Sequence, residues 1–80
     1  MTLSQTPLAR CRRWVGLTQV ELARRVGVSV SSIRQYERGV KTPSVRTAVK
    51  IARALTDAAP DDHEIIVEDL FGDESGVVGE

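Results

Sequence analysis

Helix-start and helix-stop residues divide the segment Leu17–Pro43 into two short helices joined by a tight turn. Residues Thr18-Gln19-Val20-Glu21 have the spacing of a capping box, in which the threonine hydroxyl and the glutamate carboxylate accept hydrogen bonds from backbone amides that a new helix leaves free. Gly27 can adopt the left-handed backbone of a tight turn, and Ser29 can cap the second helix. This order of signals predicts a helix-turn-helix unit over residues 18–38.

The same kinds of signal place three more helices around this unit. Thr6 can cap a helix over about residues 7–15, and Ser44 can cap one that reaches residue 55 or 58. A proline-broken loop over residues 56–62 follows, and the apolar and acidic segment Ile65–Phe71 is expected to form a short last helix whose first three residues have strand-like composition. No segment alternates strictly between apolar and polar residues, so the chain is predicted to be all-α, a compact bundle of about five short helices.

Apolar residues recur at helical spacing within each predicted helix and outline one aliphatic core. The inward positions are Leu8, Cys11, Val15, Leu22, Ala23, Val26, Ile33, Tyr36, Ala48, Ile51, Ala52 and Leu55. A chain of 80 residues, 41% of them apolar, has room for one such core. We expect a flexible start over residues 1–5, a helical domain over residues 6–71 and a disordered acidic tail over residues 72–80.

Basic and acidic residues occupy different parts of the chain, although the formal net charge is zero. All eleven Lys and Arg residues lie within residues 10–53, whereas residues 1–56 contain only two acids. The other nine acids lie in residues 57–80, which contain no Lys or Arg. The first part of the chain therefore has a surplus of nine positive charges, which suits a polyanionic partner.

The second helix of the helix-turn-helix unit presents side chains that suit the edges of DNA bases. With Ile33 and Tyr36 turned inward, its outward positions are Val30, Ser31, Arg34, Gln35 and Arg38. Arg34 can donate two hydrogen bonds to a guanine, Gln35 can pair its amide with an adenine, and Val30 can contact a thymine methyl group. A helix about 10–12 Å across also fits the major groove of B-DNA, which is about 12 Å wide.

Other polar residues around this helix suit the phosphate backbone. Gln19, at the start of the preceding helix, Arg38 and Lys41 can contact phosphate oxygens. Ser29 and the free amides of the helix N-terminus that it caps can do the same, aided by the helix dipole. An exposed arginine taken alone is usually a solvated charge. The combination of two caps, a glycine turn, an outward Arg-Gln pair and a basic surplus indicates a protein that binds double-stranded DNA.

Four motifs in this region resemble the Cro/repressor-type (Xre) helix-turn-helix family. They are Thr18-Gln19-x-x-Leu22-Ala23, Val26-Gly27-Val28-Ser29, Ile33-x-x-Tyr36-Glu37-Arg38-Gly39 and Thr42-Pro43-Ser44, and the similarity runs from about Leu8 to Leu55. The family includes the lambdoid phage repressors, restriction controller proteins and many antitoxins. The resemblance implies a lambda-repressor-like bundle of five short helices whose third helix reads the major groove, and a homodimer on a pseudo-palindromic operator.

The resemblance also implies roles for individual positions. It implies phosphate contacts for Gln19 and Lys41. The base-reading positions that it implies are Val30, Ser31, Arg34 and Gln35. It further implies that Arg12 pairs with Glu37 and so ties the first helix to the end of the third. Such a pair has a physical use here, because an unpaired Glu37 carboxylate beside the DNA surface would repel phosphate.

The chain departs from this family after its fourth predicted helix, where roughly eight extra residues precede the last helix. In the family, the end of helix 4 and helix 5 often form the dimer interface. The candidates for that interface here are Leu55, Ile66, Val67, Leu70 and Phe71. The alternative for the last four is that they cover the core of the monomer.

The acidic end of the chain is a second departure from the family. Its simplest role is to keep the protein soluble. The sharper hypothesis is that residues 72–80 shield the basic surface and weaken binding to random DNA, because negative charge near that surface lowers its attraction for phosphate.

Catalytic and metal-binding patterns are absent from the sequence. His63 is the only histidine, it lies among acids in a predicted loop, and no nucleophile, phosphate-binding loop or metal-ligand spacing accompanies it. We therefore expect no enzymatic activity, no metal and no cofactor. The single cysteine, Cys11, lies on the apolar side of its helix, which predicts a buried thiol in a reducing compartment.

Membrane association is not indicated either. No apolar run approaches the roughly 20 residues that span a bilayer, and the N-terminus lacks the apolar core of a signal peptide. We expect a cytoplasmic protein of a bacterium or phage that regulates transcription, most simply as a dimeric repressor. The main alternative is an antitoxin-type protein that holds a basic partner protein through its acidic C-terminal segment and autoregulates its promoter. A third interpretation keeps the fold for protein contacts alone and predicts no sequence-specific DNA binding.

Overall fold

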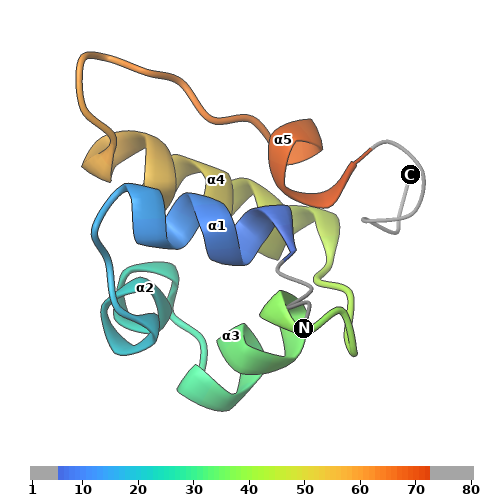
Figure 1. The fold of residues 1–80 in the computed structure, drawn as a ribbon. Coiled ribbons are helices and arrows are strands. Elements are labelled where there is room, and N and C mark those ends of the chain that lie inside the picture. The colour runs from blue at the N-terminus through green and yellow to red at the C-terminus, as the bar shows by residue number, and fades with distance from the viewer. Residues whose placement is uncertain (1–5, 73–80) are drawn as a thin grey trace, which may run out of the picture.

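Five α-helices pack into one bundle in the computed structural model, which describes residues 6–72 (Figure 1). They are α1 (Pro7–Trp14), α2 (Gln19–Val26), α3 (Val30–Glu37), α4 (Val45–Ala58) and α5 (Val67–Phe71). The all-α prediction is confirmed. The predicted flexible start, residues 1–5, and residues 73–80 of the predicted acidic tail lie outside the described residues.

Side-chain caps start four of these helices at the predicted residues. Thr18 Oγ1 accepts a hydrogen bond from the Glu21 amide at 3.0 Å, and Glu21 Oε1 accepts one from the Thr18 amide at 2.8 Å. The capping box of α2 is therefore complete. The hydroxyls of Thr6, Ser29 and Ser44 each accept a hydrogen bond from the amide three residues later.

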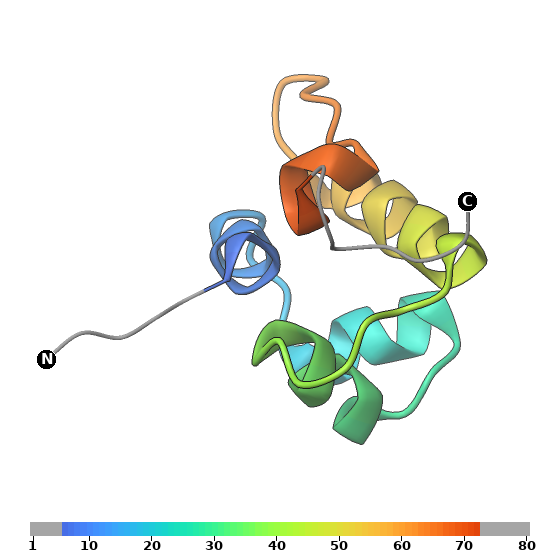
Figure 2. The same cartoon turned by 90° about the vertical axis from the view of Figure 1, so that its right-hand side faces the viewer.

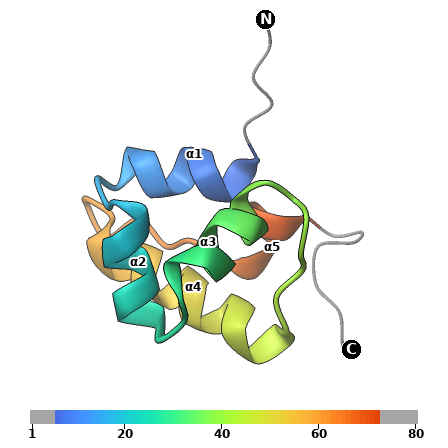
Figure 3. The same ribbon diagram turned by 90° about the horizontal axis from the view of Figure 1, so that it is seen from below.

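The turn between α2 and α3 depends on Gly27. Its φ of +87° lies in the left-handed region, where a side chain would strain the backbone. The Gly27 amide donates to the Ala23 carbonyl at 2.8 Å and so closes α2, and the chain enters α3 at Val30. Because this connection is so short, α2 and α3 lie side by side (Figure 3).

α4 continues to Ala58, the longer of its two predicted ends, so residues 56–58 are helical and not part of the predicted loop. The Thr56 hydroxyl stabilises this extra turn. Its Oγ1 lies 2.8 Å from the Ala52 carbonyl oxygen and 3.0 Å from the Ile65 carbonyl oxygen, and it accepts a hydrogen bond from the Ile65 amide at 2.9 Å. One hydroxyl thus joins the last turn of α4 to the segment that leads into α5.

α5 is shorter than the predicted segment and begins at Val67. Ile66 has extended backbone, with φ −110° and ψ 165°, which agrees with the strand-like composition noted for this stretch. The Asp69 carboxylate accepts a hydrogen bond from the Ile66 amide at 3.1 Å, so an acid in the first turn satisfies a backbone donor that α5 leaves free.

The core lies between the five helices and contains most of the predicted inward positions. Its fully buried members include Leu8, Leu22, Ile33, Ile51 and Leu55. Leu17, Pro43 and Ile65, which lie in the connections between helices, are also buried and extend the core beyond the predicted set. Cys11 and Val15 are only half-buried, and they pack against this core from its outside.

Two residues predicted at a dimer interface belong instead to the monomer core. Leu55 is 0% exposed and Leu70 is 2% exposed, so neither side chain can contact a second copy. Val67 and Phe71 are half-buried against the same core, whereas Ile66 is 43% exposed. The alternative, that the last helix covers the core, is therefore correct for Leu70.

α2 and α3 lie on one side of the bundle, opposite α5 (Figure 2). α1 and α4 pack between them, so one side of α3 remains at the surface (Figure 3). Within residues 6–72, no helix has both the length and the apolar composition that crossing a membrane requires.

Candidate nucleic-acid interface

The outer side of α3 carries the positions that were predicted to read bases. Ser31, Arg34 and Arg38 are exposed, and Val30 and Gln35 are half-buried. Val30 also packs against the edge of the core, so only part of its side chain is free to make a contact. Ile33 and Tyr36 are buried, as predicted, and hold α3 to the rest of the bundle.

A buried ion pair ties α1 to the end of α3. Arg12 Nε lies 2.5 Å from Glu37 Oε2, and Arg12 Nη2 lies 3.2 Å from Glu37 Oε1, so the guanidinium contacts both carboxylate oxygens. The two side chains are only 10% and 6% exposed. Arg12 Nη1 also donates to the Leu17 carbonyl at 2.9 Å, and the Thr6 hydroxyl donates to the Glu37 carbonyl at 2.7 Å. The two residues that the family resemblance pairs are thus in direct contact.

Gln19 connects this ion pair to the surface of α3. Its Nε2 donates to Glu37 Oε1 at 3.0 Å, and its Oε1 accepts a longer hydrogen bond from Arg34 Nε at 3.4 Å. A chain of polar contacts therefore runs from Arg12 through Glu37 and Gln19 to Arg34. The side chain predicted to clamp a phosphate is engaged at both ends, with one amide hydrogen of Nε2 left over.

The remaining predicted phosphate contacts lie at opposite ends of α3. Ser29 precedes the helix and is exposed, and its hydroxyl accepts from the Ser32 amide at 3.0 Å and donates to Ser32 Oγ at 3.1 Å. Arg38 follows the last residue of α3, and Lys41 lies in the connection to α4, both exposed. Ser29 is thus separated from Arg38 and Lys41 by the length of α3.

Three features of this surface were not predicted from the sequence. The two hydrogen bonds of Gln19 join residues 18 and 15 positions apart, for which the sequence carries no local signal. Val20 on α2 and Val40 after α3 are 49% and 67% exposed. The only sequence signal for their exposure is that neither valine falls on the inward apolar positions, Val20 within α2 and Val40 after α3.

Cys11 and His63 lie together at the other edge of α1. Cys11 is half-buried, not buried as predicted, and burial, with a smaller effect from the Asp69 charge, raises the pKa of its thiol. A raised pKa keeps the thiol protonated and poorly nucleophilic. The ring of His63 meets Trp14 edge-on, with ring centroids 5.1 Å apart. In the described part of the chain, no three His, Cys, Asp or Glu side chains are grouped as a metal site requires.

Comparison with known proteins places this arrangement among DNA-binding regulators. Residues 8–56 match the helix-turn-helix family. An uncharacterized HTH-type transcriptional regulator of Methanothermobacter thermautotrophicus is 43% identical over 65 residues, which cover 81% of this chain and 94% of the relative. A similar regulator of Archaeoglobus fulgidus is 38% identical over 68 residues, which cover 85% of this chain and 97% of the relative.

A phage protein is among the relatives as well. The cryptic phage CTXphi transcriptional repressor RstR of Vibrio cholerae is 35% identical over 65 residues, which cover 81% of this chain. The matched part is 51% of the length of RstR, so the chain spans about half of that repressor. No solved structure matches the chain significantly.

Proposed function

Because the chain belongs to the helix-turn-helix family of transcriptional regulators, we propose that it is a sequence-specific repressor that binds double-stranded DNA as a dimer and reads the major groove with α3. Repression is the choice that the name of RstR supports, since that relative is a transcriptional repressor. The site of action is the cytoplasm, where the operator is accessible.

The position of Arg34 is the observation that carries this proposal. Its guanidinium is exposed on α3, and its Nε is held by Gln19, which is itself bonded to the buried Glu37 carboxylate. An arginine that is already positioned loses less conformational freedom on binding than a free one. The two terminal nitrogens of Arg34 then remain available for O6 and N7 of a guanine.

The neighbouring residues of α3 complete the reading surface. Gln35 pairs with an adenine, Val30 contacts a thymine methyl group, and Ser31 bonds a base edge at the N-terminal end of the helix. Ser29, Arg38 and Lys41 contact phosphates at the two ends of α3, together with the spare amide hydrogen of Gln19. The phosphate contacts fix the register of the helix, and the base contacts select the sequence.

Two copies bound to related half-sites would place their α3 helices about 34 Å apart, one turn of DNA. Ile66 is the exposed candidate for the contact between copies, with the accessible parts of Val67 and Phe71 beside it. Ile66→Ser should then weaken dimerisation without unfolding the monomer, because its side chain lies outside the core.

Footprinting of the DNA that flanks the protein's own gene tests the proposal. We expect protection of a pseudo-palindrome whose half-site centres are separated by about 10 base pairs or a multiple of one turn. If the folded protein instead protected the whole fragment uniformly, without preference for any sequence, the proposed function would be contradicted.

A further inference from the structure

The outer face of α4 is a basic surface that the proposed DNA contact does not use. Val45, Arg46, Val49, Lys50 and Arg53 fall on one side of the helix and are all exposed. The two valines are 43% and 37% exposed, which leaves an apolar strip beside the cations. α4 lies behind α2 and α3 when the bundle is seen from the α3 side (Figure 3), and none of these five residues belongs to the proposed reading helix.

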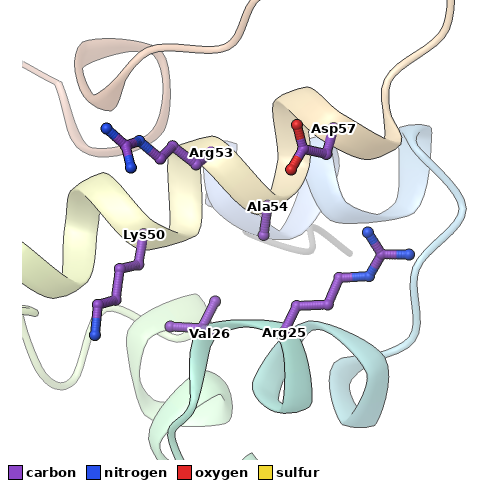
Figure 4. A pocket seen from close by; sticks show the side chains of 6 residues that line it. All are labelled: Arg25, Val26, Lys50, Arg53, Ala54 and Asp57. Carbon is purple, nitrogen blue, oxygen red and sulfur yellow. The ribbon is translucent and has the colours of Figure 1, made fainter.

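A cleft and an adjoining open site lie along this face. The cleft, of about 470 Å³, lies between the C-terminal half of α4 and α2, with Val26 and Ala54 at its base. In Figure 4, Arg25 from α2 and Lys50 from α4 extend toward the opposite helix on either side of these two residues. The other site, of about 710 Å³, is open, is lined by α4 alone from Val45 to Arg53, and shares Lys50 and Arg53 with the cleft. We call the two together the α4 groove, formed by α4 from Val45 to Asp57 with Arg25 and Val26.

The charges of the α4 groove are unbalanced. It contains four cations and one acid, Asp57. Within residues 6–72, no carboxylate lies within salt-bridge distance of Arg46, Lys50 or Arg53. Neighbouring like charges on one helix face repel each other, so an acidic occupant would lower the free energy of this surface.

We propose that the α4 groove binds residues 73–80 of the same chain, Asp-Glu-Ser-Gly-Val-Val-Gly-Glu. This segment has three acids, no Lys or Arg, and the apolar pair Val77-Val78, which complements both the cations and the exposed valines of α4. DNA phosphate would satisfy the cations alone, whereas this segment also supplies the apolar contacts and is already tethered beside the first turn of α4.

The starting point and length of the segment fit the groove. Gly72, which directly precedes it, lines a cleft with Pro43, two residues before the first residue of α4. Eight extended residues reach at most about 26–29 Å. The row from Val45 to Asp57 rises about 18 Å along the helix axis. An extended segment is therefore longer than the row of α4 residues that it would contact.

The consequence for DNA binding rests on the function proposed above. Bound in the α4 groove, the three acids would offset cations on the flank of the molecule and leave the outer side of α3 open. Attraction for random DNA depends on the summed positive charge, whereas the base contacts depend on α3. The contact would therefore raise the preference for the cognate site over random DNA.

Nuclear magnetic resonance of the full chain tests the contact without any DNA. In the triple variant Asp73→Asn, Glu74→Gln, Glu80→Gln, we expect amide shifts on the exposed side of α4, centred on Arg46 to Arg53, that do not depend on protein concentration. Unchanged α4 resonances, shifts confined to the cleft around Tyr36 and Pro43, or shifts that vanish on dilution would each overturn the proposal.

Binding to a random-sequence duplex at low salt provides a second readout. The same tail substitutions should raise affinity several-fold in the wild-type background and in the control Arg13→Glu, Arg24→Glu, whose exposed cations lie outside the groove. In Lys50→Glu, Arg53→Glu, which has the same net charge as the control, the increase should be clearly smaller. An equal increase in both charge-reversed backgrounds would overturn the proposal, whereas a lack of cognate preference in every variant would contradict the proposed function alone.

Discussion

Gln19 donates a hydrogen bond of 3.0 Å to Glu37, and the same Glu37 oxygen also accepts one from Arg12 at 3.2 Å. One buried carboxylate therefore serves two purposes. It neutralises the Arg12 guanidinium in the ion pair that joins α1 to α3. It also orients Gln19, whose side-chain oxygen accepts a hydrogen bond from Arg34. In the proposed DNA complex, these residues would serve both folding and base reading. Substitutions closer to the core should then affect mainly stability, and substitutions closer to Arg34 should affect mainly DNA binding.

We predict that Gln19 and Arg34 are energetically coupled when the protein binds its cognate duplex. Gln19→Ala and Arg34→Ala should each weaken binding, and the double variant should lose less than the sum by about 0.5 kcal/mol or more, because neighbours that share a hydrogen bond are not additive. Lys41 makes no hydrogen bond to Gln19 among the described residues, so Gln19→Ala with Lys41→Ala should be additive. Fluorescence anisotropy measures the binding free energies. If the losses were additive for Gln19 with Arg34 as well as for Gln19 with Lys41, Gln19 would not position Arg34.

Glu37→Ala should destabilise the fold by about 3–5 kcal/mol, because it leaves the Arg12 guanidinium buried without its partner. Urea denaturation followed by circular dichroism measures this. The double variant Arg12→Met, Glu37→Leu should recover much of the loss, since it removes both charges. The exposed acid Glu64 is the control, and Glu64→Ala should change the free energy of unfolding by no more than about 0.5 kcal/mol. An unchanged midpoint for Glu37→Ala would show that the pair does not stabilise the fold.

The capping box should make stability depend on acid pH. Hydrogen bonds from Thr18 lower the pKa of Glu21 from its ordinary value of 4.5. A carboxylate with a lowered pKa in the folded state stabilises the fold above its ordinary value and loses that contribution as pH falls through the lowered value. The melting temperature of the wild type should therefore exceed that of Glu21→Gln at pH 7, and the difference should shrink below pH 4.5. A difference that stays constant down to pH 2 would contradict this role of the Glu21 charge.

Thr56→Val should destabilise the fold by about 1–3 kcal/mol, because the buried Ile65 amide would lose its only hydrogen-bond acceptor in the described residues. Thr56→Ser keeps the hydroxyl and should cost less than Thr56→Val, since it removes one methyl group. Chemical denaturation of the two variants makes the comparison. Equal stability of Thr56→Val and the wild type would mean that the hydroxyl does not stabilise the connection between α4 and α5.

The helices could be predicted from the sequence because their start signals are local. Thr18 and Glu21 are three residues apart, and the amides that they satisfy belong to the same turn. Ser29 acts over the same distance at the start of α3. The outward position of Arg34 followed from the inward positions of Ile33 and Tyr36, which the helical period fixes.

The features that could not be predicted depend on residues far apart in the chain. The end of α4 is stabilised by a bond between Thr56 and Ile65, and no pattern in the sequence distinguished Leu55 from Ala58 as the last residue. Leu70 was assigned to both a dimer surface and the core, because helical spacing shows which residues share a face but not what covers that face. The contact from Gln19 to Glu37 likewise requires α2 to be packed beside α3.

The central claim is that the outer side of α3 selects the DNA sequence. The most direct test compares Arg34→Ala with Lys41→Ala on the footprinted cognate duplex and on a scrambled duplex of the same length. We predict that Arg34→Ala loses about 1–3 kcal/mol on the cognate duplex and little on the scrambled one, whereas Lys41→Ala weakens both alike and lowers the salt dependence of binding. If Arg34→Ala weakened binding to both duplexes equally, α3 would not be the reading helix and the account would be wrong.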